Sequence, residues 1–100
     1  MVYRRTMEMD DVVKAFGALA QETRLKILEL LVSADKDGMA AGDIALALGV
    51  PQNTLSFHLN QLEYADIITR RRAGRFIIYS VNRDGMKSFL HYIVQNCIQK

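Results

Sequence analysis

Hydrophobic residues recur every three or four positions in the first third of the chain, which is the spacing of an amphipathic helix. The pattern predicts one helix over about residues 10–19 and a second over about residues 22–33. The apolar stripe of the first helix consists of Met9, Val12, Val13, Phe16, Leu19 and Ala20. The second helix has a broader apolar surface, made by Leu25, Ile27, Leu28, Leu30, Leu31 and Val32. We therefore expect the second helix to be central and mostly enclosed.

A turn and two more helices are predicted next. The composition of residues 35–38 is typical of a turn, and a short helix over residues 42–48 ends at a glycine. A proline follows, which is tolerated in the first turn of a helix, so the next helix runs from about residue 52 to 65. Its core-facing residues should be Leu55, Leu59 and Leu62. Its outward side is almost uncharged and offers Gln52, Asn53, Ser56, Phe57, Asn60 and Gln61.

From Ile67 onward the period changes from helical to alternating. Two runs rich in β-branched and aromatic residues, 68–72 and 76–81, flank a glycine-containing turn and predict a hairpin. A last helix over about residues 84–97 carries an apolar stripe of Met86, Phe89, Leu90, Ile93 and Val94. The chain is thus expected to be mainly α with a two-stranded β-hairpin. We expect one domain over residues 1–100, with residues 1–8 as a flexible N-terminal arm.

The positive charge of the chain is concentrated in the predicted hairpin. The net charge of +2 says little, but four arginines fall within six residues: Arg70, Arg71, Arg72 and Arg75. Guanidinium groups this close repel one another and gain little unless an anion lies opposite, and DNA phosphates or a narrow minor groove are such anions. The alternative is a solvated edge hairpin whose charge prevents aggregation.

Composition also excludes several classes of protein. A single cysteine, Cys97, rules out an intrachain disulfide. No apolar stretch approaches the roughly 20 residues of a membrane span, and the basic start is followed by an acidic segment instead of the apolar core of a signal peptide. We expect a cytoplasmic protein with no membrane partner. Neither histidine has a nearby nucleophile with an orienting carboxylate, and no phosphate-binding glycine loop occurs, so we expect no enzyme.

The two short helices with their glycine turn predict a helix-turn-helix. A helix whose outward face offers amides and hydroxyls suits the major groove of DNA, because side-chain amides pair bidentately with adenine. The arginine hairpin directly follows this helix. Together the two features predict binding to double-stranded DNA.

Three segments then resemble one family in the right order. Residues 16–28 are similar to the opening signature of ArsR/SmtB repressors, residues 55–62 to their recognition helix, and residues 74–79 to their wing. The resemblance implies a winged helix-turn-helix homodimer that represses from an imperfect palindromic operator and releases it when an inducer binds. The apolar last helix needs a partner surface, so we expect the dimer to form through the first and last helices.

The resemblance also assigns site residues. It places Gln52, Asn53, Thr54, Ser56 and Phe57 at the DNA groove, with Arg72 and Arg75 on the wing. Phe57 stands where the family often has arginine, which favours contact with a thymine methyl group. The resemblance makes His58 a histidine that packs between helices. Arg24, inside an apolar helix, is expected to be a buried, hydrogen-bonded anchor.

The inducer is less well specified. Residues 40–44, where one arsenic-sensing pattern has paired cysteines, contain no thiol, and Asp84 with His91 offers too few ligands for a tetrahedral zinc site. The chain is most similar to the branch with arsenic-binding cysteines at the end of the last helix. Cys97 falls at that position, although Ile98 replaces the usual second cysteine.

The resemblance therefore suggests arsenite or antimonite as the inducer, with Cys97 as its ligand. The alternative for Cys97 is a surface thiol without a sensory role. For the whole protein, the alternative is a winged helix without metal sensing, which binds DNA constitutively or uses its hairpin for a protein partner.

Overall fold

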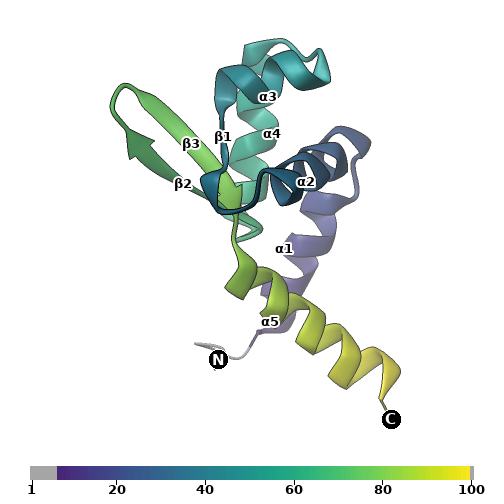
Figure 1. Ribbon diagram of the computed structural model, residues 1–100. Helices are drawn as coiled ribbons and strands as arrows, with labels where there is room; N and C mark the ends of the chain where they lie inside the picture. The colour runs from purple at the N-terminus through teal and green to yellow at the C-terminus, as the bar shows by residue number, and fades with distance from the viewer. Residues whose placement is uncertain (1–6, 100) are drawn as a thin grey trace.

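The computed structural model describes residues 7–99 and contains five α-helices with a small sheet at one side of them (Figure 1). In chain order the elements are α1 Met9–Leu19, α2 Glu22–Ala34, a 3₁₀ turn Asp35–Asp37, β1 Met39–Ala40, α3 Ala41–Leu48, α4 Gln52–Tyr64, β2 Ile68–Ala73, β3 Phe76–Val81, α5 Arg83–Ile93 and a π-helical turn Val94–Ile98. The predicted helices and hairpin are all present, and their ends differ from the predictions by a few residues at most.

The core forms where α2, α3 and α4 meet the base of the hairpin. Its most enclosed side chains are Ile27, Leu31, Ile44, Leu55, Leu59, Leu62, Ile67 and Ile68. The prediction that Leu55, Leu59 and Leu62 face inward is confirmed. Helix α2 is enclosed on one side only, since Leu25 and Val32 are exposed.

The turn between α3 and α4 is set by Gly49, as the sequence predicts. This residue has a φ of 66°, a left-handed conformation that glycine adopts without a steric penalty. The next residue, Val50, donates its backbone N–H to the carbonyl of Ala45 at 3.1 Å. Pro51 is the N-cap of α4 and accepts from Leu55 N at 2.9 Å. The two helices are thereby joined within three residues.

The sheet has three antiparallel strands in the order β1-β3-β2, so the prediction of a two-stranded hairpin is incomplete. In the additional pairing, Met39 lies opposite Tyr79 and Ala40 opposite Ile78. Just before β1, Gly38 has a φ of 69°, and a Cβ there would collide with the carbonyl oxygen of Tyr79. Glycine at this position allows the chain to approach β3 closely.

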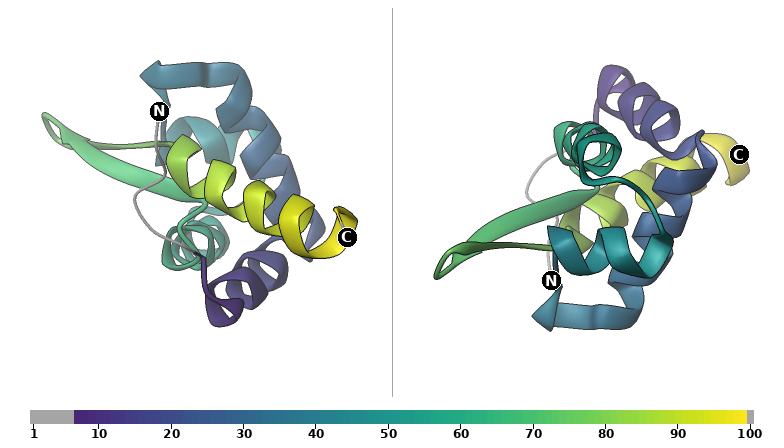
Figure 2. Two further views of the ribbon diagram at one scale, coloured as in Figure 1. Left: turned by 90° about the horizontal axis from the view of Figure 1, so that it is seen from below. Right: turned by 90° about the horizontal axis from the view of Figure 1, so that it is seen from above.

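The hairpin and the last helix project at opposite sides of the molecule (Figure 2). Helix α5 leaves the sheet, crosses α1 and continues beyond the core to the C-terminal end (Figure 1). Phe89 packs edge-on against Phe16 of α1, with ring centroids 5.1 Å apart, and is buried within the protomer. The sequence pattern places Phe89 in the apolar stripe that is expected to face the partner. In the structure, Phe89 packs in the protomer's own core instead.

Most of the N-terminal arm expected over residues 1–8 lies outside the described residues. The two described members are Met7, which is buried, and Glu8, which caps α1 together with Asp11. Within residues 7–99, no helix is both long enough and apolar enough to cross a membrane.

Candidate nucleic-acid interface

Helix α4 presents the residues that the sequence assigns to the DNA groove. Its inward side is buried in the core, and the opposite side exposes all five candidates: Gln52, Asn53, Thr54, Ser56 and Phe57. These side chains gather on the first half of the helix, next to the turn from α3. Their contact with DNA stays a prediction, and the structure makes them accessible for it.

One of these side chains already has an internal hydrogen bond. The side-chain oxygen of Asn53 accepts from the backbone N–H of Thr54 at 2.9 Å, in the first turn of α4. The N–H groups of a first turn have no partner within the helix, so this bond satisfies one of them. The amide oxygen has a second lone pair, so Asn53 can keep this bond while it pairs with a base.

Phe57, Arg24 and His58 form a cluster that the sequence did not predict as a unit. The guanidinium carbon of Arg24 lies 5.9 Å from the centroid of the Phe57 ring, within the range of a cation–π interaction. The His58 ring meets the Phe57 ring edge-on at 5.8 Å. Arg24 therefore connects α2 to the exposed face of α4. The only signal for this in the sequence is a lone arginine inside an apolar helix.

Two buried nitrogen atoms lie in this cluster. Arg24 Nε and His58 Nδ1 are both shielded from solvent without a hydrogen-bond partner among residues 7–99. The expectation that Arg24 is a hydrogen-bonded anchor is thus wrong for Nε, because its side chain is held against an aromatic ring instead. His58 is 8 % exposed, in keeping with an inward-packed histidine. Burial lowers the pKa of His58 below 6.5, and the nearby charge of Arg24 lowers it further.

The four hairpin arginines are divided between the fold and the solvent. Arg70 pairs with Glu63 of α4 at 3.2 Å, and Arg71 donates to the carbonyl of Asp37 at 3.0 Å. These two guanidinium groups have internal acceptors, so the idea that all four need an external anion is wrong for this pair. The two interactions tie the hairpin to α4 and to the 3₁₀ turn.

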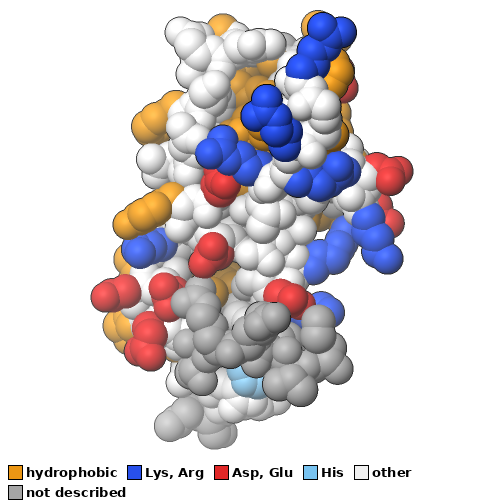
Figure 3. Space-filling view, turned by 90° about the vertical axis from the view of Figure 1, so that its left-hand side faces the viewer, with side chains coloured by type: hydrophobic (Ala, Val, Ile, Leu, Met, Phe, Trp, Pro, Cys, Tyr) orange, Lys and Arg blue, Asp and Glu red, His pale blue; other side chains and the backbone are white. Residues whose placement is uncertain are grey.

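Arg72 and Arg75 lie closer to the hairpin tip. Arg72 donates to the carbonyl of Gly74 at 3.3 Å, and Arg75 lies 5.8 Å from the ring centroid of exposed Phe76. Neither interaction involves a carboxylate, so both positive charges are available to an external anion. Lys and Arg side chains gather in the upper part of the face toward which the hairpin projects (Figure 3).

The candidate inducer residues are not brought together. Cys97 is exposed in the π-helical turn, and Asp84 and His91 lie at different positions along α5. Among residues 7–99, no group of three or more His, Cys, Asp or Glu side chains is arranged to hold a metal ion.

Apolar side chains are exposed on both the first and the last helix. On α1 they are Met9, Val13 and Phe16, and on α5 with its π-helical turn they are Leu90, Val94 and Ile98. Exposed apolar groups in such number mark a surface for association. They lie on the two helices from which the sequence predicts the dimer.

Comparison with known proteins agrees with this architecture. A helix-turn-helix domain family matches residues 19–71. The transcriptional repressor SdpR of Bacillus subtilis is 39 % identical over 85 residues, which cover 85 % of this chain and 90 % of SdpR. A putative arsenical resistance operon repressor, ArsR2 of Halobacterium salinarum, is 31 % identical over 67 % of this chain and 56 % of its own length.

A solved structure shows the same fold. The homodimeric winged helix-turn-helix DNA-binding domain Mb0332 of Mycobacterium bovis, described as a possible ArsR-family transcriptional regulator, superposes with a TM-score of 0.71 at 29 % identity. The match covers 88 % of this chain and 81 % of that one. The prediction of a winged helix-turn-helix is confirmed by the likeness to Mb0332. The prediction that the protein is not an enzyme is confirmed by the match to a helix-turn-helix family and to the transcriptional repressor SdpR.

Proposed function

The chain belongs to the ArsR family of winged helix-turn-helix transcriptional repressors, and we propose that it binds an imperfect palindromic operator in double-stranded DNA as a homodimer. The observation that carries this proposal is the exposed first half of α4. Its side chains offer amides, hydroxyls and one aromatic ring, without a charged group, on a helix whose other side is fixed in the core. Such a face suits the edges of bases in a major groove.

Each groove residue has a chemical role in this proposal. Gln52 and Asn53 would pair with adenine, while Thr54 and Ser56 would bond to bases or to phosphates. Phe57 would contact a thymine methyl group. At the hairpin, Arg72 and Arg75 would bind phosphates or enter the minor groove, which adds affinity without reading the sequence.

The exposed apolar residues of α1 and α5 support the homodimer. A two-fold partner would cover both stripes at once with the same surface. Two copies of α4 would then face successive major grooves about 34–36 Å apart. Bound in this way, the dimer would repress by blocking access to the promoter. A regulator that acts on the chromosome would work in the cytoplasm.

Equilibrium binding to the DNA upstream of its own gene tests this function. Fluorescence anisotropy with that duplex, and with a shuffled duplex of equal length and composition, separates specific from non-specific affinity. We expect the upstream duplex to bind at least 10³-fold more tightly, the lower end of the range for specific regulators. Equal affinity for both duplexes would overturn operator recognition.

The proposal also assigns an inducer and its ligand on the protein. Arsenite or antimonite would bind Cys97, since a thiolate is the natural ligand for a soft metalloid. Each protomer contributes one thiol among residues 7–99, and that thiol is exposed. A three-coordinate site would need thiols from elsewhere, so we expect arsenite to release the operator weakly or not at all.

Titration of the protein–operator complex with arsenite measures this directly. If Cys97 is the ligand, whatever release arsenite causes in the parent should disappear in Cys97→Ser. Operator affinity without arsenite should stay unchanged. Strong release that persists in the serine variant would place the inducer site elsewhere.

A further inference from the structure

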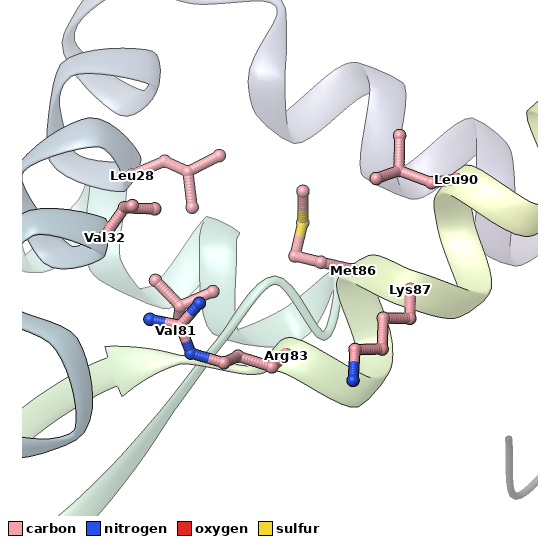
Figure 4. Close-up of a pocket in the computed structure, with 7 residues that line it drawn as sticks. All are labelled: Leu28, Val32, Val81, Arg83, Met86, Lys87 and Leu90. Atoms are coloured by element: carbon pink, nitrogen blue, oxygen red, sulfur yellow. The ribbon is translucent and has the colours of Figure 1, made fainter. Parts of the chain in front are cut away.

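An apolar hollow lies between α2, the end of β3 and α5, away from the residues assigned to DNA (Figure 4). It holds about 200 Å³ of space and is partly open to solvent. Its lining residues are Leu28, Val32, Val81, Arg83, Met86, Lys87 and Leu90. In Figure 4 the side chain of Met86 lies between those of Leu28 and Leu90.

The apolar walls of this hollow are incompletely covered by the protomer. Leu28 is buried at its floor, but Val32 is 49 % exposed and Leu90 is 55 % exposed. Burying such side chains under an apolar ligand is favourable, at about 25 cal/mol for each Å² removed from water. The hollow is thus shaped and lined like a small binding site for an apolar group.

Two cations stand at the edge of the hollow. Arg83 pairs with Asp35 at 3.0 Å, and both of these side chains are partly exposed. Within the described part of the chain, Lys87 forms no ion pair with a carboxylate. Both cations belong to the first turns of α5, where the helix dipole also favours negative charge. Asp35 offsets the charge of Arg83, and Asp84 lies in the same first turn, so Lys87 is the cation at this edge that an anion could pair with.

We propose that this hollow binds a small amphipathic monoanion: a carboxylate with a short aliphatic chain or a single aromatic ring. The apolar body would lie against Leu28, Met86 and Leu90, and the carboxylate would pair with Lys87 at the edge. Size supports a small ligand, because an apolar cavity of about 150 Å³ already accommodates benzene. The hollow is slightly larger than that and smaller than the pockets of drug-sized ligands.

A ligand bound in the hollow would alter the dimer surface through its contact with Leu90. This residue is both a wall of the hollow and a member of the exposed apolar stripe on α5. A ligand that shifts Leu90 would change how α5 packs against the partner and hence the spacing of the two α4 helices. This consequence rests on the proposed operator-binding dimer, whereas ligand binding itself does not.

The test uses octanoate and its neutral analogue 1-octanol with the full chain, in the absence of DNA. Two-dimensional NMR should show saturable shifts of the amide signals of Val32, Val81, Met86 and Leu90 with octanoate. Octanol should bind more weakly, because it lacks the charge. Lys87→Glu should weaken octanoate binding by up to about fivefold, as expected when an exposed ion pair worth at most about 1 kcal/mol is removed. The same variant should leave octanol binding unchanged.

Matched variants distinguish binding in the hollow from general effects of a changed charge or of a larger side chain. Lys26→Glu makes the same charge change on α2, at a lysine that pairs with Glu22 at 3.0 Å, and should leave octanoate binding unaffected. Val32→Phe should fill the hollow and abolish binding of both compounds, whereas Leu46→Phe, at an exposed residue of α3, should not. Equal binding of octanoate and octanol, or an equal loss in Lys26→Glu, would overturn the proposal.

A second copy of the chain could instead fill the hollow in the dimer. In that case the hollow's signals would not respond to octanoate, and contacts between protomers would be seen at Val32 and Met86, which would also overturn the proposal. Because these measurements contain no DNA, failure of operator binding would leave their result intact. Octanoate binding that leaves operator affinity unchanged would overturn the coupling through Leu90.

Discussion

Arg24 on α2 holds the ring of Phe57 on α4, with its guanidinium carbon 5.9 Å from the ring centroid. Phe57 is the aromatic member of the exposed face of α4, so a residue on α2 contacts one of the side chains proposed to reach DNA. The interaction should be worth about 0.5–1 kcal/mol at a partly exposed site. It should matter for DNA binding only if Phe57 contacts the operator.

Arg24→Gln should therefore weaken operator binding, and the loss should disappear in a Phe57→Ala background. A double-mutant cycle measured by anisotropy gives the coupling energy. Replacing an operator thymine by deoxyuridine removes its methyl group. At the thymine that Phe57 contacts, this replacement should weaken DNA binding by the parent but not by Phe57→Ala. Additive effects of Arg24→Gln and Phe57→Ala would show that the two residues act independently.

The wing gives a second prediction. Arg75→Ala should weaken operator and shuffled DNA by similar factors, because an interaction with a phosphate carries no sequence information. The slope of log affinity against log salt should become shallower by roughly 0.9 for each phosphate that the variant no longer neutralises. Arg70→Ala is the matched control, since that guanidinium pairs with Glu63, and it should leave the slope nearly unchanged. Equal slopes for the parent and Arg75→Ala would remove the hairpin from the DNA interface.

The apolar surface of α5 gives a third prediction. Val94→Asp should yield a monomer in sedimentation at concentrations where the parent is a dimer, because a carboxylate buried in the interface is costly to desolvate. Leu46→Asp introduces the same charge at a leucine that is 84 % exposed on α3 and should stay dimeric. Phe89→Asp is less informative, because Phe89 is packed within the protomer. A dimeric Val94→Asp would place the interface elsewhere.

The lowered pKa of His58 gives a fourth prediction, for stability. Because folding lowers this pKa, the unfolded chain binds the proton first as the pH falls. The native state should lose stability as the pH drops below 6.5, until the pH passes the lowered pKa of the folded protein. Urea unfolding at about pH 7.5 and about pH 5.5 measures the loss.

His58→Gln should show a smaller loss of stability between these two conditions than the parent does. If the pH dependence of His58→Gln matched that of the parent, the buried histidine would not be the group that titrates.

Much of the fold could be predicted because its signals are local. The helices follow from apolar spacing, and Gly49 and Pro51 mark the turn between α3 and α4. Strand β1 could not be predicted, because two residues have no period and their partner Tyr79 lies on a distant strand. The spacing of the apolar residues on α5 does not separate its two sides, one of which packs toward α1 through Phe89 while the other is exposed at Leu90.

The sequence predicts which residue types form the candidate site, but it does not predict most of the contacts between them. Exposure of the α4 face follows from the leucines on its other side. The internal partners of the hairpin arginines do not follow from a sequence pattern, because Asp37 is 34 positions from Arg71 in the sequence. The contact between Arg24 and Phe57 likewise depends on how α2 packs against α4, which no local pattern reports.

If the exposed face of α4 reads bases in the operator, the single change Ser56→Ala should weaken binding to the operator selectively. The variant removes one hydroxyl from the exposed side of α4, so the fold should be unaffected. Its affinity for the upstream duplex and for a shuffled duplex should be measured at the same salt concentration. We predict a loss equivalent to about 0.5–1.5 kcal/mol on the upstream duplex, the net value of one hydrogen bond, and almost none on the shuffled one. Equal losses on both duplexes would make Ser56 a phosphate contact, and no loss on either would remove it from the interface; either result would contradict base reading by Ser56.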